Sequence, residues 1–261
     1  MPPTLSRLAV MTTTASMIMA HSASGATTPV EVLRILAAGA TESTLRAVVA
    51  EFEEQSGNRL AVTYGGVGHL RDRLVAGEPA DLVIVTPAII EQLQEKDLVR
   101  PASRVDLGRV GGGIAVRAGA PRPRVSSPEE LKRALLAAEE IYFPDPAKTT
   151  AGAYLLSVAD RLGVGGDVRR KAHTAPGGKE AMEQLARSRA RAIGLTQMSE
   201  ILSVREVVLV GPYPAPLQKA TTYSGIVTTR AARPFVAQEF LRFLATPAVQ
   251  ARFRDAGFER M

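Results

Sequence analysis

The 261-residue sequence contains no cysteine and no tryptophan. Without cysteine there can be no disulfide, no thiolate nucleophile and no cysteine-ligated metal site. Only five Tyr and seven Phe are available to stack on nucleobases, and the basic residues are scattered along the chain. We therefore expect no nucleic-acid partner. The net charge of +6 suits an anionic ligand, although general solubility accounts for it as well.

Histidine is also scarce, with three residues in the whole chain. His69 and His173 are far apart in sequence, and no carboxylate stands at ligand spacing from either, so we expect no metal site. A Ser-His-Asp triad has no nucleophile-elbow motif to support it. These absences predict a protein that works without a metal.

The N-terminus has the pattern of a secretory signal peptide. Arg7 precedes an apolar run at residues 8–20, and small residues at 24–26 offer a cleavage site. The run is short for a membrane span, and no later segment is long and apolar enough to cross a bilayer. We expect residues 1–26 to be removed and the mature chain to begin near Thr27 in the periplasm.

A glycine-rich junction at residues 63–70 follows a predicted strand at 59–64 and opens a predicted helix at 70–76. Glycines allow a close backbone approach, and a helix N-terminus presents free N–H groups with a partial positive charge. The junction therefore predicts an anion site, with His69 at its edge. It is not a nucleotide loop, because no Gly-Lys-Ser/Thr follows it.

Strand and helix patterns alternate along the remainder of the chain. Strands are expected at 32–38, 59–64 and 82–85, each followed by an amphipathic helix, which predicts a parallel sheet. A glycine-rich strand at 110–116 suits a crossover into a second α/β lobe. The fold class is therefore α/β with two lobes. The first comprises residues 27–110 and 226–261, and the second comprises residues 111–225.

Four segments resemble the periplasmic molybdate-binding proteins over essentially the whole mature chain. They are the runs at 37–41, 77–82, 145–152 and 193–195, of which the Gly-Glu-Pro-Ala-Asp phrase at 77–81 is the most specific. The resemblance implies a type II periplasmic binding-protein fold, in which each lobe is a sheet flanked by helices and the ligand lies in a cleft between them.

The family binds molybdate through hydroxyls and backbone N–H groups of five loops. The matching positions here are Ala40, Val67, Ala151, Gly178 and Gln197. The family usually has serine at the first two positions and often tyrosine at the last. Each lost hydroxyl bond to a buried anion would cost about 1.5–3 kcal/mol, which weakens the molybdate interpretation. The helix N-termini remain, and they suit any anion.

Basic residues stand beside these positions. Arg71 follows the glycine junction, Lys148 precedes Thr149, and Lys179 follows the glycines at 177–178. Arg and Lys suit a carboxylate ligand, although surface exposure is an equally open interpretation for Arg71 and Lys179. The predicted binding residues are Ala40, Thr41, Val67, Gly68, Arg71, Lys148, Thr149, Ala151, Gly178 and Gln197.

Two functions remain open. The first is a receptor that delivers an oxyanion or a carboxylate to an ABC permease, as most of the family does. The second is an isomerase, because aconitate isomerases are similar to molybdate-binding proteins. Their reaction moves an allylic proton without a cofactor and needs cationic contacts for three carboxylates and one titratable group. We favour the monomeric, periplasmic isomerase of cis- and trans-aconitate with His69 as the base. Glu42, Asp145 and His173 are the rival bases.

Overall fold

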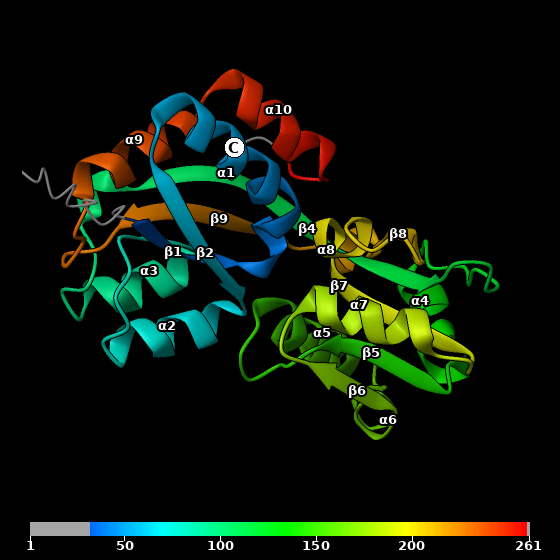
Figure 1. Ribbon diagram of the computed structural model, residues 1–261. Coiled ribbons are helices and arrows are strands. Elements are labelled where there is room, and N and C mark those ends of the chain that lie inside the picture. Colours follow the sequence, from blue (N-terminus) through cyan, green and yellow to red (C-terminus); the bar gives the residue numbers. More distant parts are fainter. Residues whose placement is uncertain (1–31, 260–261) are drawn as a thin grey trace, which may run out of the picture. The chain divides into compact units, whose positions relative to one another are not determined.

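The computed structural model describes residues 32–259 (Figure 1). The expected signal peptide lies outside the described residues. Within the described part of the chain, no helix has the length and apolar character that a bilayer crossing requires.

The first lobe is built on a mostly parallel sheet. The strand β1 (Val32–Ala38) pairs in parallel with β2 (Arg59–Gly65) and β3 (Leu82–Val85). The strand β9 (Ala220–Val227) then runs antiparallel to β3. All four residues of β3 are buried, as expected for a strand that is covered on both faces.

Helices cover both faces of this sheet, because right-handed crossovers in opposite directions place successive helices on opposite sides. The chain moves from β1 outward to β2 through α1 (Glu42–Ser56) and returns to β3 through α2 (Val67–Val75). Figure 1 shows α1 with the C-terminal helices above the sheet and α2 with α3 below it. The remaining helices of this lobe are α3 (Pro87–Gln94), α9 (Pro234–Leu244) and α10 (Pro247–Asp255), with short 3-10 turns at Gly39–Thr41 (η1) and Pro101–Ser103.

The second lobe has its own sheet. The strand β5 (Glu140–Pro144) runs parallel to β6 (Ala172–Ala175) and β7 (Ala192–Gln197). The strand β8 (Val207–Pro212) closes the other edge. Its helices are α4 (Pro128–Ala137), α5 (Thr150–Arg161), α6 (Gly165–Arg170), α7 (Gly178–Arg187) and α8 (Met198–Leu202), with a 3-10 turn at Ala215–Leu217.

The long strand β4 (Val105–Arg117) belongs to both sheets. Its first part, up to Gly111, pairs with β9, and its second part, from Gly112, pairs with β7 and β8. One hydrophobic core contains residues from 33–110 and 223–258, whereas two others lie within residues 114–217. We propose that the boundaries between the lobes lie at 110/111 and 225/226, as expected from the sequence. The second boundary falls within the strand β9.

The structure differs from the sequence predictions at the starts of two helices. The helix α2 begins at Val67 rather than at Leu70, since the N–H of Leu70 already donates to the carbonyl of Gly66 at 3.0 Å. The run at 144–152 was expected to be a loop that leads into a helix, but α5 already begins at Thr150, because Thr149 caps it. The strand β8 and the short helix α8 were not predicted.

Candidate functional site

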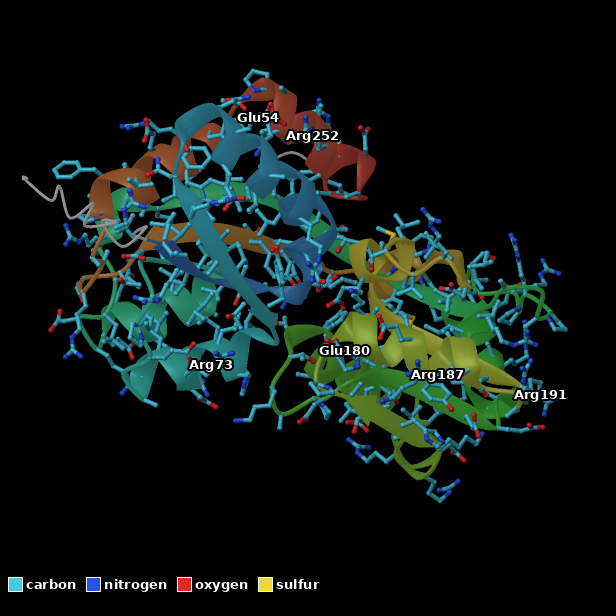
Figure 2. The ribbon with its side chains drawn as sticks, in the orientation of Figure 1. Glu54, Arg73, Glu180, Arg187, Arg191 and Arg252 are labelled. Carbon is cyan, nitrogen blue, oxygen red and sulfur yellow. The ribbon has the colours of Figure 1, made fainter. Side chains whose placement is uncertain are left out.

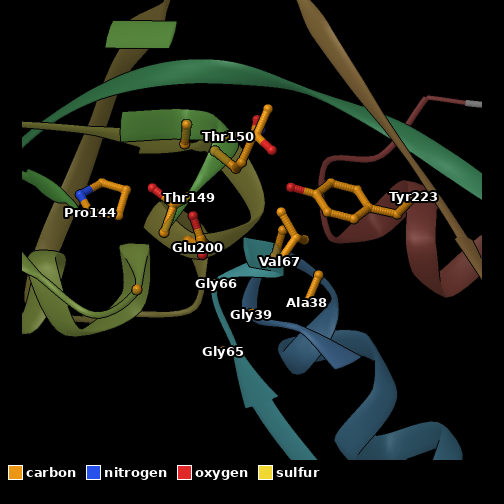
Figure 3. Close-up of a pocket in the computed structure, with 14 residues that line it drawn as sticks. Ala38, Gly39, Gly65, Gly66, Val67, Pro144, Thr149, Thr150, Glu200 and Tyr223 are labelled. Atoms are coloured by element: carbon orange, nitrogen blue, oxygen red, sulfur yellow. The ribbon is translucent and has the colours of Figure 1, made fainter. Parts of the chain in front are cut away.

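A small cavity lies where the loops of the two lobes meet (Figure 3). It is found at the carboxyl ends of β1, β2, β5 and β7, the edge at which open α/β sheets bind ligands. Its volume is about 20 Å³, which is room for little more than one water molecule. A larger ligand can therefore occupy this cavity only if the lobes separate.

The cavity is surrounded by helix N-termini. The N-cap residues of α2, α5, α7 and α8, which are Gly66, Thr149, Gly177 and Gln197, all line it. Each of these helices directs its N-terminus, and with it the positive end of its dipole, to this side. Four helix N-termini therefore converge on this cavity, one from the first lobe and three from the second.

Most of the predicted binding positions come together here. The cavity lining includes Ala40, Val67, Thr149, Ala151 and Gln197. Gly178 is adjacent to the lining residue Gly177, and its N–H points to a side chain of the cavity, as described below. Thr41 is buried, but it does not line the cavity; its Oγ1 donates to the carbonyl of Ala38 at 2.7 Å.

The glycine junction packs directly against the second lobe. The N–H of Gly68 donates to the carbonyl of Lys148 at 3.1 Å. A β-carbon on Gly66 would lie 2.7 Å from the same carbonyl oxygen, so no larger residue fits without displacing the loop. The glycines at 66 and 68 therefore allow the backbones of the two lobes to touch.

The side-chain amide of Gln197 is hydrogen-bonded to the two strands that connect the lobes, β4 and β9, and is therefore not free to bind a ligand. Its amide nitrogen donates to the carbonyls of Val110 and Gly111, both at 3.1 Å, and its oxygen accepts from Thr221 Oγ1 at 3.0 Å. It therefore ties β7 to the part of β4 that passes between the lobes.

Glu200 is the main feature of the site that the sequence analysis missed. Its carboxyl group is buried, lines the cavity, and accepts a hydrogen bond from the N–H of Gly178 at 3.3 Å; the other oxygen is hydrogen-bonded to Thr196 Oγ1. Burial raises the pKa of Glu200 to about 7, while these hydrogen bonds and the backbone of Gln197 oppose the rise. The site therefore contains a carboxyl group that can gain or lose a proton near neutrality.

Tyr223, also missed, lines the same cavity from β9, and Figure 3 shows its hydroxyl end directed into the space that Thr150 and Val67 border. The residue is 4% exposed, and burial raises the pKa of its phenol. The hydroxyl is therefore a neutral hydrogen-bonding group.

An outer groove of about 570 Å³ adjoins the cavity and shares the lining residues Gly65, Gly66 and Gly177 with it. His69 lines this groove and is exposed. Its wall also includes Tyr64, Arg73, Asp145, Lys148 and Glu180. Figure 2 shows that Arg73 comes from α2 and Glu180 from α7, so both lobes form the groove.

The predicted cations have carboxylate partners. Lys148 Nζ lies 2.5 Å from Asp72 Oδ2, and Arg71 donates to the other oxygen of Asp72 at 2.7 Å and to Gln92 Oε1 at 2.9 Å. Lys179 Nζ lies 3.0 Å from Glu42 Oε1. Lys148 borders the groove, whereas Arg71 lines neither space, because a helix that begins at Val67 turns residue 71 toward α3.

Of the three alternative candidates for the catalytic base, one lines the outer groove and the other two do not. Asp145 lines the outer groove, and its Oδ1 accepts from the N–H of Ala147 at 2.8 Å. His173 stacks on Tyr142, with ring centroids 4.8 Å apart, and lines neither space. Glu42 lines neither space and is paired with Arg46 as well as with the lysine described above.

Comparisons with known proteins agree with the fold. The chain is 30% identical over 250 residues to an aconitate isomerase of a Pseudomonas species, which covers 94% of each chain. The structure is similar to the periplasmic molybdate-binding protein of Azotobacter vinelandii, with a TM-score of 0.74, 19% identity, and coverage of 88% of this chain and 99% of that one. It is also similar to a sulfate-binding protein of Mycobacterium tuberculosis, with a TM-score of 0.72, 18% identity, and coverage of 88% and 87%.

These likenesses confirm the predicted two-lobed periplasmic binding-protein fold and the family resemblance on which it rested. The family model for bacterial extracellular solute-binding proteins matches residues 33–259, nearly all of the described chain. The chain belongs to the family of bacterial extracellular solute-binding proteins.

Proposed function

We propose that this protein is a cofactor-independent isomerase that interconverts cis- and trans-aconitate. The observation that carries the proposal is the similarity, over 94% of both chains, to a protein that is named an aconitate isomerase. The neighbours below 25% identity support only the fold and do not bear on the ligand.

The site chemistry supports a polycarboxylate ligand. Four helix N-caps surround the cavity, an arrangement that stabilises negative charge. Ala40 and Val67 offer no hydroxyl to an oxyanion, and Glu200 already accepts a hydrogen bond from the N–H of Gly178. A compact oxyanion such as molybdate would therefore find fewer hydrogen-bond donors here than in a site with hydroxyl groups at these positions.

The reaction needs a base beside the allylic carbon and positive charge beside the carboxylates. We propose His69 as the base, since it lines the outer groove and has an accessible imidazole. Lys148 borders the same groove, and we propose that it leaves Asp72 to pair with a ligand carboxylate. The backbones at the predicted positions in the cavity would hold a second carboxylate.

The cleft must open before an aconitate molecule can reach the helix N-termini from the outer groove, because the cavity there is about 20 Å³. We propose that the ligand binds between separated lobes and that the ion pair of Lys148 with Asp72 breaks at this step. The N–H of Gly68 would likewise leave the carbonyl of Lys148. Closure around the ligand would then exclude water from the reacting carbons.

Ultraviolet absorbance of purified protein mixed with trans-aconitate tests this function. We expect the absorbance to move toward the equilibrium mixture of the two isomers at a rate proportional to enzyme concentration. A thermal-shift series with aconitate, citrate, molybdate and sulfate runs beside it, and stabilisation by the tricarboxylates is expected. Absence of turnover together with stabilisation by molybdate would refute the isomerase.

We further propose that the mature protein is a periplasmic monomer.

A receptor for an ABC permease is the second candidate, and the family match favours it. The two candidates differ in one measurable property. A receptor binds its ligand and releases it unchanged, whereas the isomerase leaves an equilibrium mixture of cis- and trans-aconitate in solution. Chromatography of the ligand recovered from the protein separates the two outcomes.

A further inference from the structure

The carboxyl group of Glu200 lies between two glycines, Gly178 and Gly39, and a side chain at either position would approach it closely. A β-carbon on Gly178 would lie 2.0 Å from Glu200 Oε2 and 2.1 Å from Thr196 Oγ1. On the other side, a β-carbon on Gly39 would lie 3.2 Å from Glu200 Oε1. Glycine at 178 therefore makes the room in which this acidic side chain reaches the cavity from α8.

The surroundings of Glu200 contain no described cation at bonding distance. It accepts hydrogen bonds from the hydroxyl of Thr196 and from the backbone of Gly178 and Gln197, and the charged group that acts on it through space is Glu180 of α7. The phenol of Tyr223 lines the same cavity and is neutral. Burial and the charge of Glu180 raise the pKa of the Glu200 carboxyl more than its hydrogen bonds lower it, so the protonated form is accessible near neutral pH.

An anionic ligand strengthens that preference. A carboxylate brought to the helix N-termini around the cavity adds negative charge near Glu200, which favours its protonated form further. A protonated carboxyl can donate a hydrogen bond to the ligand and can transfer its proton. The same group in the ionised state would repel the ligand.

We propose that Glu200 is the acid that delivers the proton in the allylic shift. This inference rests on the proposed isomerase function. As the base His69 removes a proton from the methylene carbon, the electron pair of that C–H bond forms the new double bond. The electron pair of the old double bond then takes the proton of the Glu200 carboxyl at its far carbon. His69 ends protonated and Glu200 ionised, and exchange with water restores both groups before the next turnover.

The variant Glu200→Gln tests the inference, because the amide keeps the size of the side chain but has no acidic proton. We expect its turnover to fall by roughly 10²–10⁴-fold. Binding of trans-aconitate, measured by isothermal titration calorimetry, should stay within about tenfold of the wild type. The control is Glu239→Gln, an exposed carboxyl on α9, which should keep full activity. Turnover by Glu200→Gln within about threefold of the wild type would overturn the inference.

A measurement on the wild-type protein covers the case in which the variant does not fold. In D2O, proton delivery from a solvent-exchanged carboxyl predicts one deuterium in the new methylene group of each product molecule. Product without deuterium would show that the abstracted proton itself is returned, and Glu200 would then have no part in its delivery. If the wild-type protein turns over no aconitate, the proposed function fails; if it turns over aconitate and Glu200→Gln does too, only this inference fails.

Discussion

The Nζ atom of Lys148 lies 2.5 Å from Oδ2 of Asp72, and this ion pair joins the loop before α5 to helix α2. The backbone of the same lysine accepts a hydrogen bond from Gly68. One residue of the second lobe therefore holds α2 of the first lobe through its side chain and its carbonyl. Both contacts lie beside the groove that we propose the ligand enters.

Asp72→Asn should change the response of the protein to acid. The pKa of the Asp72 carboxyl is lowered to about 2, first by the hydrogen bond from Lys148 and then by that from Arg71. An unfolded aspartate titrates near a pKa of about 4, so the ionised group stabilises the fold above that pH. This stabilisation is lost as the pH falls from about 4 to about 2, and solvent exposure keeps it small.

Urea unfolding at several pH values between about 5 and about 2 measures this effect. The wild type should lose more unfolding free energy over this range than Asp72→Asn. The control Asp255→Asn removes an exposed carboxyl at the end of α10 and should follow the wild type. Parallel curves for the wild type and Asp72→Asn would show that the ion pair adds nothing to stability.

Lys148→Ala should weaken both ligand binding and turnover. A hydrogen bond to a charged group contributes about 1.5–3 kcal/mol, so kcat/KM for trans-aconitate should fall by roughly 10- to 100-fold. Asp72→Asn should act in the opposite direction on affinity, because it frees the lysine for the ligand. Lys132→Ala, which removes an exposed lysine from α4, is the matched control. Equal kcat/KM for Lys148→Ala and this control would contradict the proposed role.

His69→Gln should lower turnover by roughly 10²–10⁴-fold if the imidazole is the base. The melting temperature should stay within about 2 °C of the wild type, because the side chain is exposed and lines an open groove. Unchanged turnover would move the base to Asp145, which lines the same groove, ahead of Glu42 and His173, which do not.

Gly178→Ala should destabilise the protein although alanine favours helices. Its β-carbon would lie 2.0 Å from Glu200 Oε2, and overpacking of this kind costs about 1–3 kcal/mol in unfolding free energy. Gly166→Ala in α6 is the control, since its nearest atom belongs to a flexible arginine 3.6 Å away. Urea unfolding compares the two variants. Equal midpoints would mean that the Glu200 carboxyl moves aside at no cost.

The sequence predicted which loops meet at the cavity, because those loops have recognisable residues at strand ends. Ala40, Val67 and Ala151 all line the cavity, as the resemblance implied. Arg71 was placed in the first turn of a helix that was expected to begin at Leu70. The true start at Val67 makes it the fifth residue of α2, and a three-residue shift rotates a side chain by about 300°.

Glu200 and Tyr223 could not be singled out from the pattern. Glu200 lies on the five-residue helix α8, which is too short to show a hydrophobic period. The only local signal was its position four residues after Thr196, which puts the two side chains within hydrogen-bonding reach. Tyr223 is one apolar residue on an alternating strand, and only the packing of β9 against the cavity reveals its position.

Because the strand β4 is shared by both sheets, it affects how the protein unfolds. Its residues up to Gly111 are hydrogen-bonded in one sheet and its residues from Gly112 in the other, with the Gln197 amide bonded to the carbonyls at the junction. Neither lobe can lose its sheet without freeing an edge of the other. Despite separate hydrophobic cores, the two lobes should therefore melt in a single cooperative transition, with equal calorimetric and van't Hoff enthalpies.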